Sequence, residues 1–115
     1  MGEQRRYERV GIQGLEADVS DGVGCFPGVI TDISRFGMLM TDLPKRVDGS
    51  VKRMTVVVSG HGKNFKMLVR PQWSKDTGLR QQMGFQILST PWEWTSFVMK
   101  LEPKNETDVW GVVNL

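Results

Sequence analysis

Short runs in which apolar and polar residues alternate make up most of the chain between positions 10 and 87. Side chains two apart on a strand point to the same face, so this alternation is typical of half-buried β-strands. Turn-forming segments separate the runs: Ser20-Asp21-Gly22, Ser59-Gly60-His61-Gly62, Asp76-Thr77-Gly78, and a loop from Leu43 to Ser50. The pattern predicts six strands, at about 10–19, 23–33, 36–40, 51–58, 65–73 and 79–87.

Two interruptions of the strand pattern predict local geometry. The apolar face that begins at Val10 shifts by one residue from Leu15 onward, and Gly14 lies at the shift. A glycine at such a shift predicts a β-bulge. In the second strand, Pro27 lacks the N–H that a sheet ladder uses, so Pro27 and Gly28 predict an edge or a kink.

One helix is expected after the strands. Four residues spaced i, i+3, i+4 and i+7 form an apolar stripe: Trp94, Phe97, Val98 and Leu101. The preceding Thr90-Pro91-Trp92-Glu93 matches a capping box with proline at the first helical position, and Pro103 ends the pattern. Together, these elements predict a mainly all-β fold. It is a six-stranded antiparallel β-barrel, closed or nearly closed, with a C-terminal helix that covers an opening or an edge.

Composition narrows the class of protein. The net charge of only +2 argues against a protein that coats nucleic acid. Cys25 is the single cysteine, so an internal disulfide and a multi-cysteine metal site are excluded. No apolar run reaches the roughly 18 residues of a membrane helix, and residues 1–9 are polar and basic, unlike a secretory signal. We therefore expect a cytoplasmic protein without membrane insertion.

No residue pattern indicates catalysis. His61 is the chain's only histidine and lies in a glycine-flanked turn, which leaves Ser59 without a plausible catalytic triad. Neither a G-x-S-x-G motif nor a phosphate-binding G-x-x-x-x-G-K-[S/T] loop is present. We expect no enzymatic activity, no cofactor and no metal.

The first candidate binding motif is Arg5-Arg6-Tyr7-Glu8-Arg9, an R-x-x-x-R pattern. A spacing of four places Arg5 and Arg9 on the same side of either a helix or a strand. Guanidinium groups bind phosphate oxygens bidentately, pair with guanine O6 and N7, and stack on flat rings. The segment is therefore either an anion-binding arm or a solvated basic tail.

The second candidate motif is Asp32-Ile33-Ser34-Arg35-Phe36-Gly37, a D-x-S-x-x-G pattern. Asp32 and Ser34 are two apart and share a strand face. A carboxylate there can accept hydrogen bonds from the N1–H and N2–H₂ groups of guanine, and Ser34 adds a hydroxyl. Gly37 permits a positive φ or a close approach of a ligand to the backbone. The alternative is an ordinary strand end followed by a turn.

Both motifs, in this order, resemble those of the PilZ family. That family carries R-x-x-x-R just before its first strand and [D/N]-x-S-x-x-G further along its barrel. The matching residues here are Arg5, Arg9, Asp32, Ser34 and Gly37. Met83-Gly84-Phe85 is similar to the family's late G-x-F strand, and a helix is expected after that strand in the family as well. The resemblance covers residues 5–101.

The resemblance implies a receptor for the bacterial second messenger cyclic di-GMP. The arginines would contact phosphate and guanine, while Asp32 and Ser34 would hold a guanine edge. Arg6 is a further candidate for a phosphate contact. Trp73 is either an aromatic beside the ligand, as in some family members, or an ordinary barrel aromatic. Gln4 precedes the first arginine, where the family's residue influences whether one ligand or an intercalated pair binds, and this leaves the stoichiometry open.

The expected organisation has three parts: a flexible arm at 1–9, the barrel and helix at 10–103, and a tail at 104–115. Bound ligand would pin the arm against the barrel and change the surface that an unidentified protein partner meets. In the tail, the segment from Asp108 to Val113 is either a late strand or a partner-binding segment. Two other functions stay open, a PilZ-like adaptor that binds no nucleotide and a small oligonucleotide-binding barrel. The low net charge disfavours the second, so no DNA partner is expected.

Overall fold

The computed structural model describes residues 8–103, so Gln4, Arg5, Arg6 and the tail at 104–115 lie outside the described residues. Six strands and one helix follow one another along the chain. They are β1 (Val10–Ser20), β2 (Cys25–Ser34), β3 (Gly37–Pro44), β4 (Met54–Gly60), β5 (Lys63–Asp76), β6 (Arg80–Ser89) and α1 (Trp92–Leu101).

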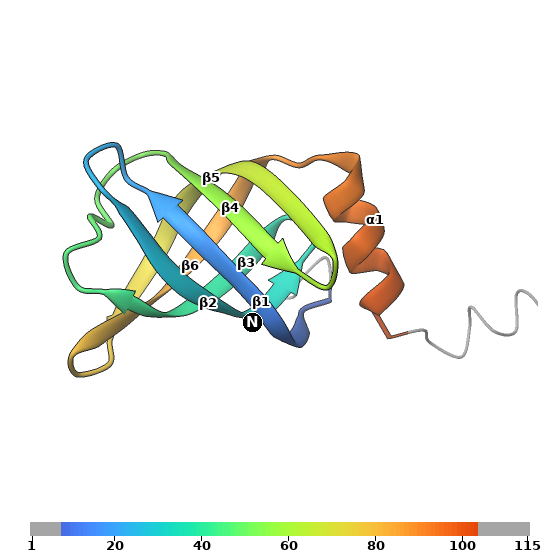
Figure 1. Cartoon of the computed structure of the whole chain (residues 1–115), viewed down its shortest axis with the longest axis horizontal. Helices are drawn as coiled ribbons and strands as arrows, with labels where there is room; N and C mark the ends of the chain where they lie inside the picture. The colour runs from blue at the N-terminus through green and yellow to red at the C-terminus, as the bar shows by residue number, and fades with distance from the viewer. Residues whose placement is uncertain (1–7, 104–115) are drawn as a thin grey trace, which may run out of the picture.

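The strands form a closed barrel in the order β1-β2-β3-β6-β5-β4, in which every neighbouring pair is antiparallel (Figure 1). Closure comes from β4, which pairs with β1. The predicted six-stranded antiparallel barrel with a C-terminal helix is confirmed. The pairing of β3 with β6 instead of β4 joins strands far apart in the sequence and positions the site described below.

The two predicted irregularities occur where the sequence places them. The β1–β2 register shifts between Gly11 and Leu15, and Gly14 has a φ of 85° that a side chain would strain. Pro27 pairs with Asp18 of β1, whereas the β2–β3 register begins only at Val29. The strand therefore has a ladder partner on one side at Pro27, which suits a residue that has no N–H to donate.

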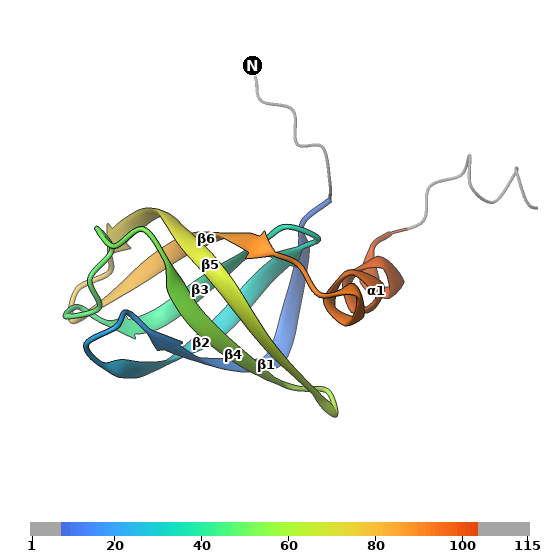
Figure 2. The same cartoon turned by 90° about the horizontal axis from the view of Figure 1, so that it is seen from above.

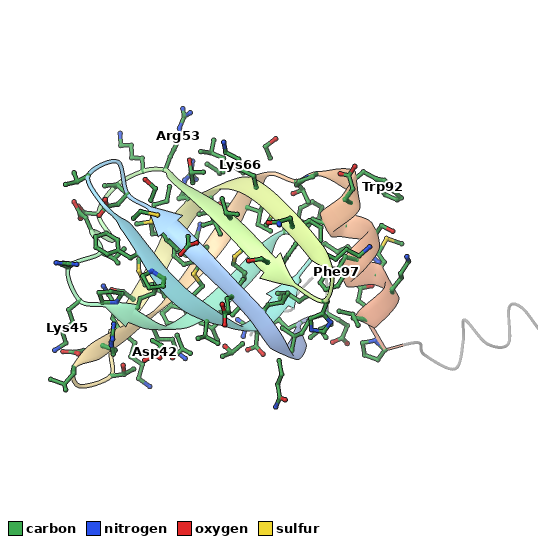
Figure 3. The ribbon with its side chains drawn as sticks, viewed as in Figure 1. Asp42, Lys45, Arg53, Lys66, Trp92 and Phe97 are labelled. Atoms are coloured by element: carbon green, nitrogen blue, oxygen red, sulfur yellow. The ribbon has the colours of Figure 1, made fainter. Side chains whose placement is uncertain are left out.

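Alternation along the strands fills the barrel with apolar side chains, and no polar or charged residue among those described is buried. Helix α1 packs at one end of the barrel (Figures 1 and 2). Its Trp94 and Phe97 rings meet Phe65 of β5, with ring centroids 5.2 and 5.4 Å apart. Figure 3 shows Phe97 on the barrel side of the helix, while Trp92 lies on the outer side. The helix thus covers one barrel opening, as predicted.

Several local predictions are wrong. Pro91, with φ −67° and ψ 148°, is itself the residue that caps the helix, and no side chain caps it. Thr90 therefore lies one position too early to form the capping box. Phe36 belongs to the β2–β3 turn and not to the third strand, and Leu79 belongs to the turn before β6, where it is 92% exposed. Leu101 completes the helical stripe in sequence but is exposed at the end of α1.

Candidate ligand-binding groove

The D-x-S-x-x-G motif lies at the end of β2 and in the turn to β3, and the barrel order places β6 and β5 beyond it. Cross-strand register aligns Asp32 with Leu39, Leu39 with Gly84, and Gly84 with Trp73. A single row across four strands therefore joins the carboxylate of the motif to the indole of Trp73. The next row joins Ser34 to Gly37, then to Gln86 and Arg70.

An open groove of about 320 Å³ follows these rows on the outer wall of the barrel. Every candidate ligand residue within the described range lines it: Arg9, Asp32, Ser34, Gly37 and Trp73. The groove also includes residues that the sequence did not single out as ligand residues: Phe36, Leu39, Gln72, Gly84 and Phe85 among them. Residues from positions 9 to 85 therefore meet at one surface. The β2–β3 turn, which contributes to this surface, lies near α1 (Figure 2).

Trp73 lies in the groove because Gly84 has no side chain. A Cβ built on Gly84 would collide with the indole Nε1 and would lie 2.6 Å from its Cε2 atom. The indole therefore occupies the space over the Gly84 backbone, the arrangement in which an aromatic residue covers a cross-strand glycine. The side chain remains 44% exposed, so a face of the ring is open to a flat partner.

Of the two purposes that the sequence offers for Gly37, the positive φ is wrong, and the close approach of a ligand stays a prediction. Its φ is not positive, since the positive-φ glycines of the described residues are all elsewhere. A Cβ at Gly37 would instead lie 3.0 Å from the carbonyl oxygen of Phe85 and 3.4 Å from Ser34 Oγ. Glycine thus allows β3 to approach β6 closely and leaves the groove floor open beside the Ser34 hydroxyl.

Hydrogen bonds join the β2–β3 turn, which carries the D-x-S-x-x-G motif, to α1 and to the residue that follows it. The Trp94 indole Nε1 donates to the carbonyl oxygen of Ser34 over 3.1 Å. The Arg35 guanidinium donates to both carboxylate oxygens of Glu102, each over 2.8 Å. Both charged side chains are largely covered, with exposures of 29% and 14%. The hydrogen bond from Arg35 holds the pKa of Glu102 below its ordinary value.

The groove offers three kinds of contact. Arg9 supplies a guanidinium for an anion, Asp32 and Ser34 supply acceptors for N–H donors, and Trp73 supplies a ring for stacking. Within residues 8–103, no group of three or more histidine, cysteine, aspartate or glutamate side chains could hold a metal ion. In the same range, no helix has the length and apolar character needed to cross a bilayer.

Gln72 could not be identified from the sequence because its position depends on a bulge. The β5–β6 register pairs Pro71 with Phe85 and Trp73 with Gly84, so Gln72 is an extra residue on β5. No glycine or change of alternation marks this bulge in the sequence. Gly84 did carry a signal, since it lies in the Met83-Gly84-Phe85 segment that resembles the late family strand.

Two solved structures share this architecture. The PilZ domain of YcgR from Escherichia coli, solved with c-di-GMP, matches with a TM-score of 0.69 at 15% identity, over 86% of this chain and 92% of that chain. The chain has a PilZ-like fold. The Bacillus subtilis inhibitor of motility MotI/DgrA also matches with a TM-score of 0.69, at 9% identity and over 86% of this chain. This PilZ-like chain spans 50% of the MotI/DgrA chain. No protein-family model and no curated protein sequence matches it.

Proposed function

We propose that this protein is a cyclic di-GMP receptor that binds the dinucleotide in the groove and catalyses no reaction. The observation that carries the proposal is the meeting of Arg9, Asp32, Ser34 and Trp73 at one groove. A ligand with two phosphates and two guanines requires anion, hydrogen-bond and stacking contacts together, and the groove supplies all three. The PilZ domain of YcgR, which has the same fold, was solved with c-di-GMP.

Each residue has a role that follows from its chemistry. Asp32 accepts hydrogen bonds from the N1–H and N2–H₂ groups of one guanine, and Ser34 adds its hydroxyl at the same edge. Arg9 binds phosphate, together with Arg5 and Arg6 from the segment before it. Trp73 stacks on a base, an interaction of about 1–3 kcal/mol in nucleic-acid complexes. Gly37 keeps the floor of the groove clear for the ligand.

Signalling follows from where the arginines lie along the chain. Arg9 stands immediately before β1 and lines the groove. A ligand that binds Arg9 together with Arg5 and Arg6 would hold the segment that carries them against the barrel. Neutralising several like charges removes the repulsion that opposes this arrangement. The bound state then presents a different surface to a protein partner, which is a ligand-driven ordering of a terminal segment.

A PilZ-like adaptor that binds no nucleotide is the second candidate. The observation in its favour is Trp92, which is 69% exposed on the outer side of α1 and available to a partner (Figure 3). An adaptor has no need for a carboxylate, a guanidinium and an aromatic ring in one groove. We therefore favour the receptor, and ligand titration separates the two.

Isothermal titration calorimetry with cyclic di-GMP tests the receptor. We expect Arg9→Ala and Asp32→Ala each to weaken binding at least tenfold, because losing one charged hydrogen-bonded contact costs about 1.5–3 kcal/mol. Arg53→Ala and Asp18→Ala are matched controls, since both residues are exposed and neither lines the groove. Titrations with GTP and single-stranded DNA test the nucleotide and oligonucleotide alternatives. Absence of cyclic di-GMP binding by the wild-type protein would refute the receptor.

A further inference from the structure

The bulge in β5 presents two consecutive side chains to the groove. In a regular strand Gln72 and Trp73 would point to opposite faces. Because Gln72 is the extra residue between the pairs at Pro71 and Trp73, both side chains instead lie on the outer wall. Both are exposed, and both line the groove. The groove therefore has a hydrogen-bonding amide directly beside its stacking ring.

The Gln72 amide is hydrogen-bonded to a neighbouring amide. Its Nε2 donates to Oε1 of Gln86 over 2.9 Å. Gln86 pairs with Gly37 across the β3–β6 ladder, so the amide pair lies on the strand next to the glycine of the motif. With one of its two Nε2–H groups engaged by Gln86, Gln72 keeps its Oε1 as an acceptor at the groove.

The two ends of the groove are too far apart to read the same base. Asp32 and Trp73 are at opposite ends of a row of four strands. Because the indole lies over Gly84 of β6, two strand spacings, roughly 10 Å along the sheet, separate the ring from Asp32, and this distance exceeds the span of one purine ring. A ligand with two bases can place one at Asp32 and the other at Trp73.

We propose that Gln72 is a specificity residue for the second guanine of the ligand. This inference rests on the proposed cyclic di-GMP function. The second guanine stacks on Trp73, and Gln72 Oε1 accepts a hydrogen bond from its N1–H or N2–H₂ group. Adenine has no donor at N1 or C2, so in the same pose it offers no hydrogen bond to Gln72 Oε1. Gln86 is a positioning residue that acts through Gln72.

Cyclic GMP–AMP with two 3′–5′ linkages is the discriminating probe because it carries one guanine and one adenine. Its guanine should go to the charged Asp32 end, which leaves the adenine at Trp73. We expect the wild-type protein to bind cyclic di-GMP about threefold to tenfold more tightly than cyclic GMP–AMP, the range for one neutral hydrogen bond. Gln72→Leu should lower affinity for cyclic di-GMP by that factor, leave cyclic GMP–AMP unchanged, and bring the ratio close to one.

Two further variants complete the test. Gln86→Leu should lower the ratio in the same direction but by less, since Gln72 keeps its own acceptor. Gln13→Leu is the matched control, because Gln13 is an exposed glutamine on β1 outside the groove, and its ratio should equal that of the wild type. Thermal melts confirm that the variants fold.

The outcomes separate the two proposals. If Gln72→Leu keeps the wild-type ratio, or weakens both ligands equally, the role of Gln72 is wrong while the receptor stands. A wild-type protein that binds both ligands equally also overturns that role. If the wild-type protein binds neither ligand, the receptor itself fails, and the role of Gln72 with it.

Discussion

Replacing Gly84 by alanine should weaken ligand binding while leaving the barrel folded. The new Cβ would lie where the Trp73 indole now lies, 2.6 Å from its Cε2 atom, and the ring must move. Gly84 does not have a positive φ, so alanine can adopt the strand backbone without strain. The indole is already 44% exposed and can turn toward solvent.

The expected free-energy changes show that Gly84→Ala should weaken ligand binding more than it lowers stability. A buried tryptophan covers up to about 250 Å², and slightly more than half of Trp73 is covered here. Re-exposing part of that area costs about 1–2 kcal/mol at 25 cal/mol per Å². Alanine returns about 0.5–1 kcal/mol relative to glycine in a strand. Stability should therefore fall by about 1.5 kcal/mol or less, whereas losing base stacking should weaken cyclic di-GMP binding by about 1–3 kcal/mol, roughly fivefold to 150-fold.

A double-mutant cycle tests this reasoning. Gly84→Ala and Trp73→Ala should each weaken cyclic di-GMP binding in calorimetry. The double variant should bind about as the weaker single variant does, because both changes remove the same ring from the groove. Fully additive losses, or wild-type affinity in Gly84→Ala, would show that the glycine does not position the ring.

Two further predictions concern stability, measured by urea unfolding. Glu102→Gln should cost about 1–2 kcal/mol at pH 7, because it breaks a largely covered ion pair with Arg35. Since folding lowers the pKa of Glu102, this contribution is present above the ordinary value of 4.5 and is lost as the pH falls through the lower folded value. Gly60→Ala should cost about 3 kcal/mol or more, because the φ is 143° and the new Cβ would collide with a backbone carbonyl of β1. Gly62→Ala, at φ 71° with open space around it, should cost only about 1–2 kcal/mol.

Each of these predictions has a matched comparison. Glu93→Gln removes an exposed carboxylate from the first turn of the same helix and should change stability by less than about 1 kcal/mol. A stability gap between wild type and Glu102→Gln that does not narrow between pH 7 and pH 3 would contradict the assigned pKa direction. Equal losses from the two glycine substitutions would show that backbone conformation, and not the collision, sets the cost at Gly60.

Alternation of apolar residues was sufficient to predict the strands because a barrel wall has one buried and one exposed face. The bulge at Gly14 was predictable because the apolar face shifts there and a glycine occupies the shift. The predicted capping box is absent because Pro91, and not Thr90, is the N-cap residue. Which residue becomes the N-cap depends on how the chain leaves β6. The turn position of Phe36 depended on where β2 ends, which alternation alone does not fix.

The candidate site was predictable in its residues but not in its shape. The D-x-S-x-x-G motif identifies Asp32 and Ser34 as ligand residues, and the family resemblance makes Trp73 a candidate. The row that joins these residues, however, requires the β3–β6 pairing. Such a pairing joins segments about forty residues apart, and local sequence patterns do not encode it. Gln72 was missed for the same reason, because its direction comes from a register slip against β6. The roles of Gln4, Arg5 and Arg6 remain predictions.

At Pro27, β2 has no ladder partner from β3, and this gap affects how the molecule avoids unwanted association. Backbone groups left without a neighbour invite an extended segment of another chain to add on, which leads to aggregation. At this gap the exposed position is held by an imino acid that cannot donate, and the depression there is lined by the carboxylates of Glu16, Asp18 and Asp42 against the single cation of Arg80. An incoming strand would meet negative charge and one missing hydrogen bond. Partners of this barrel should therefore recognise side chains and not extend its sheet.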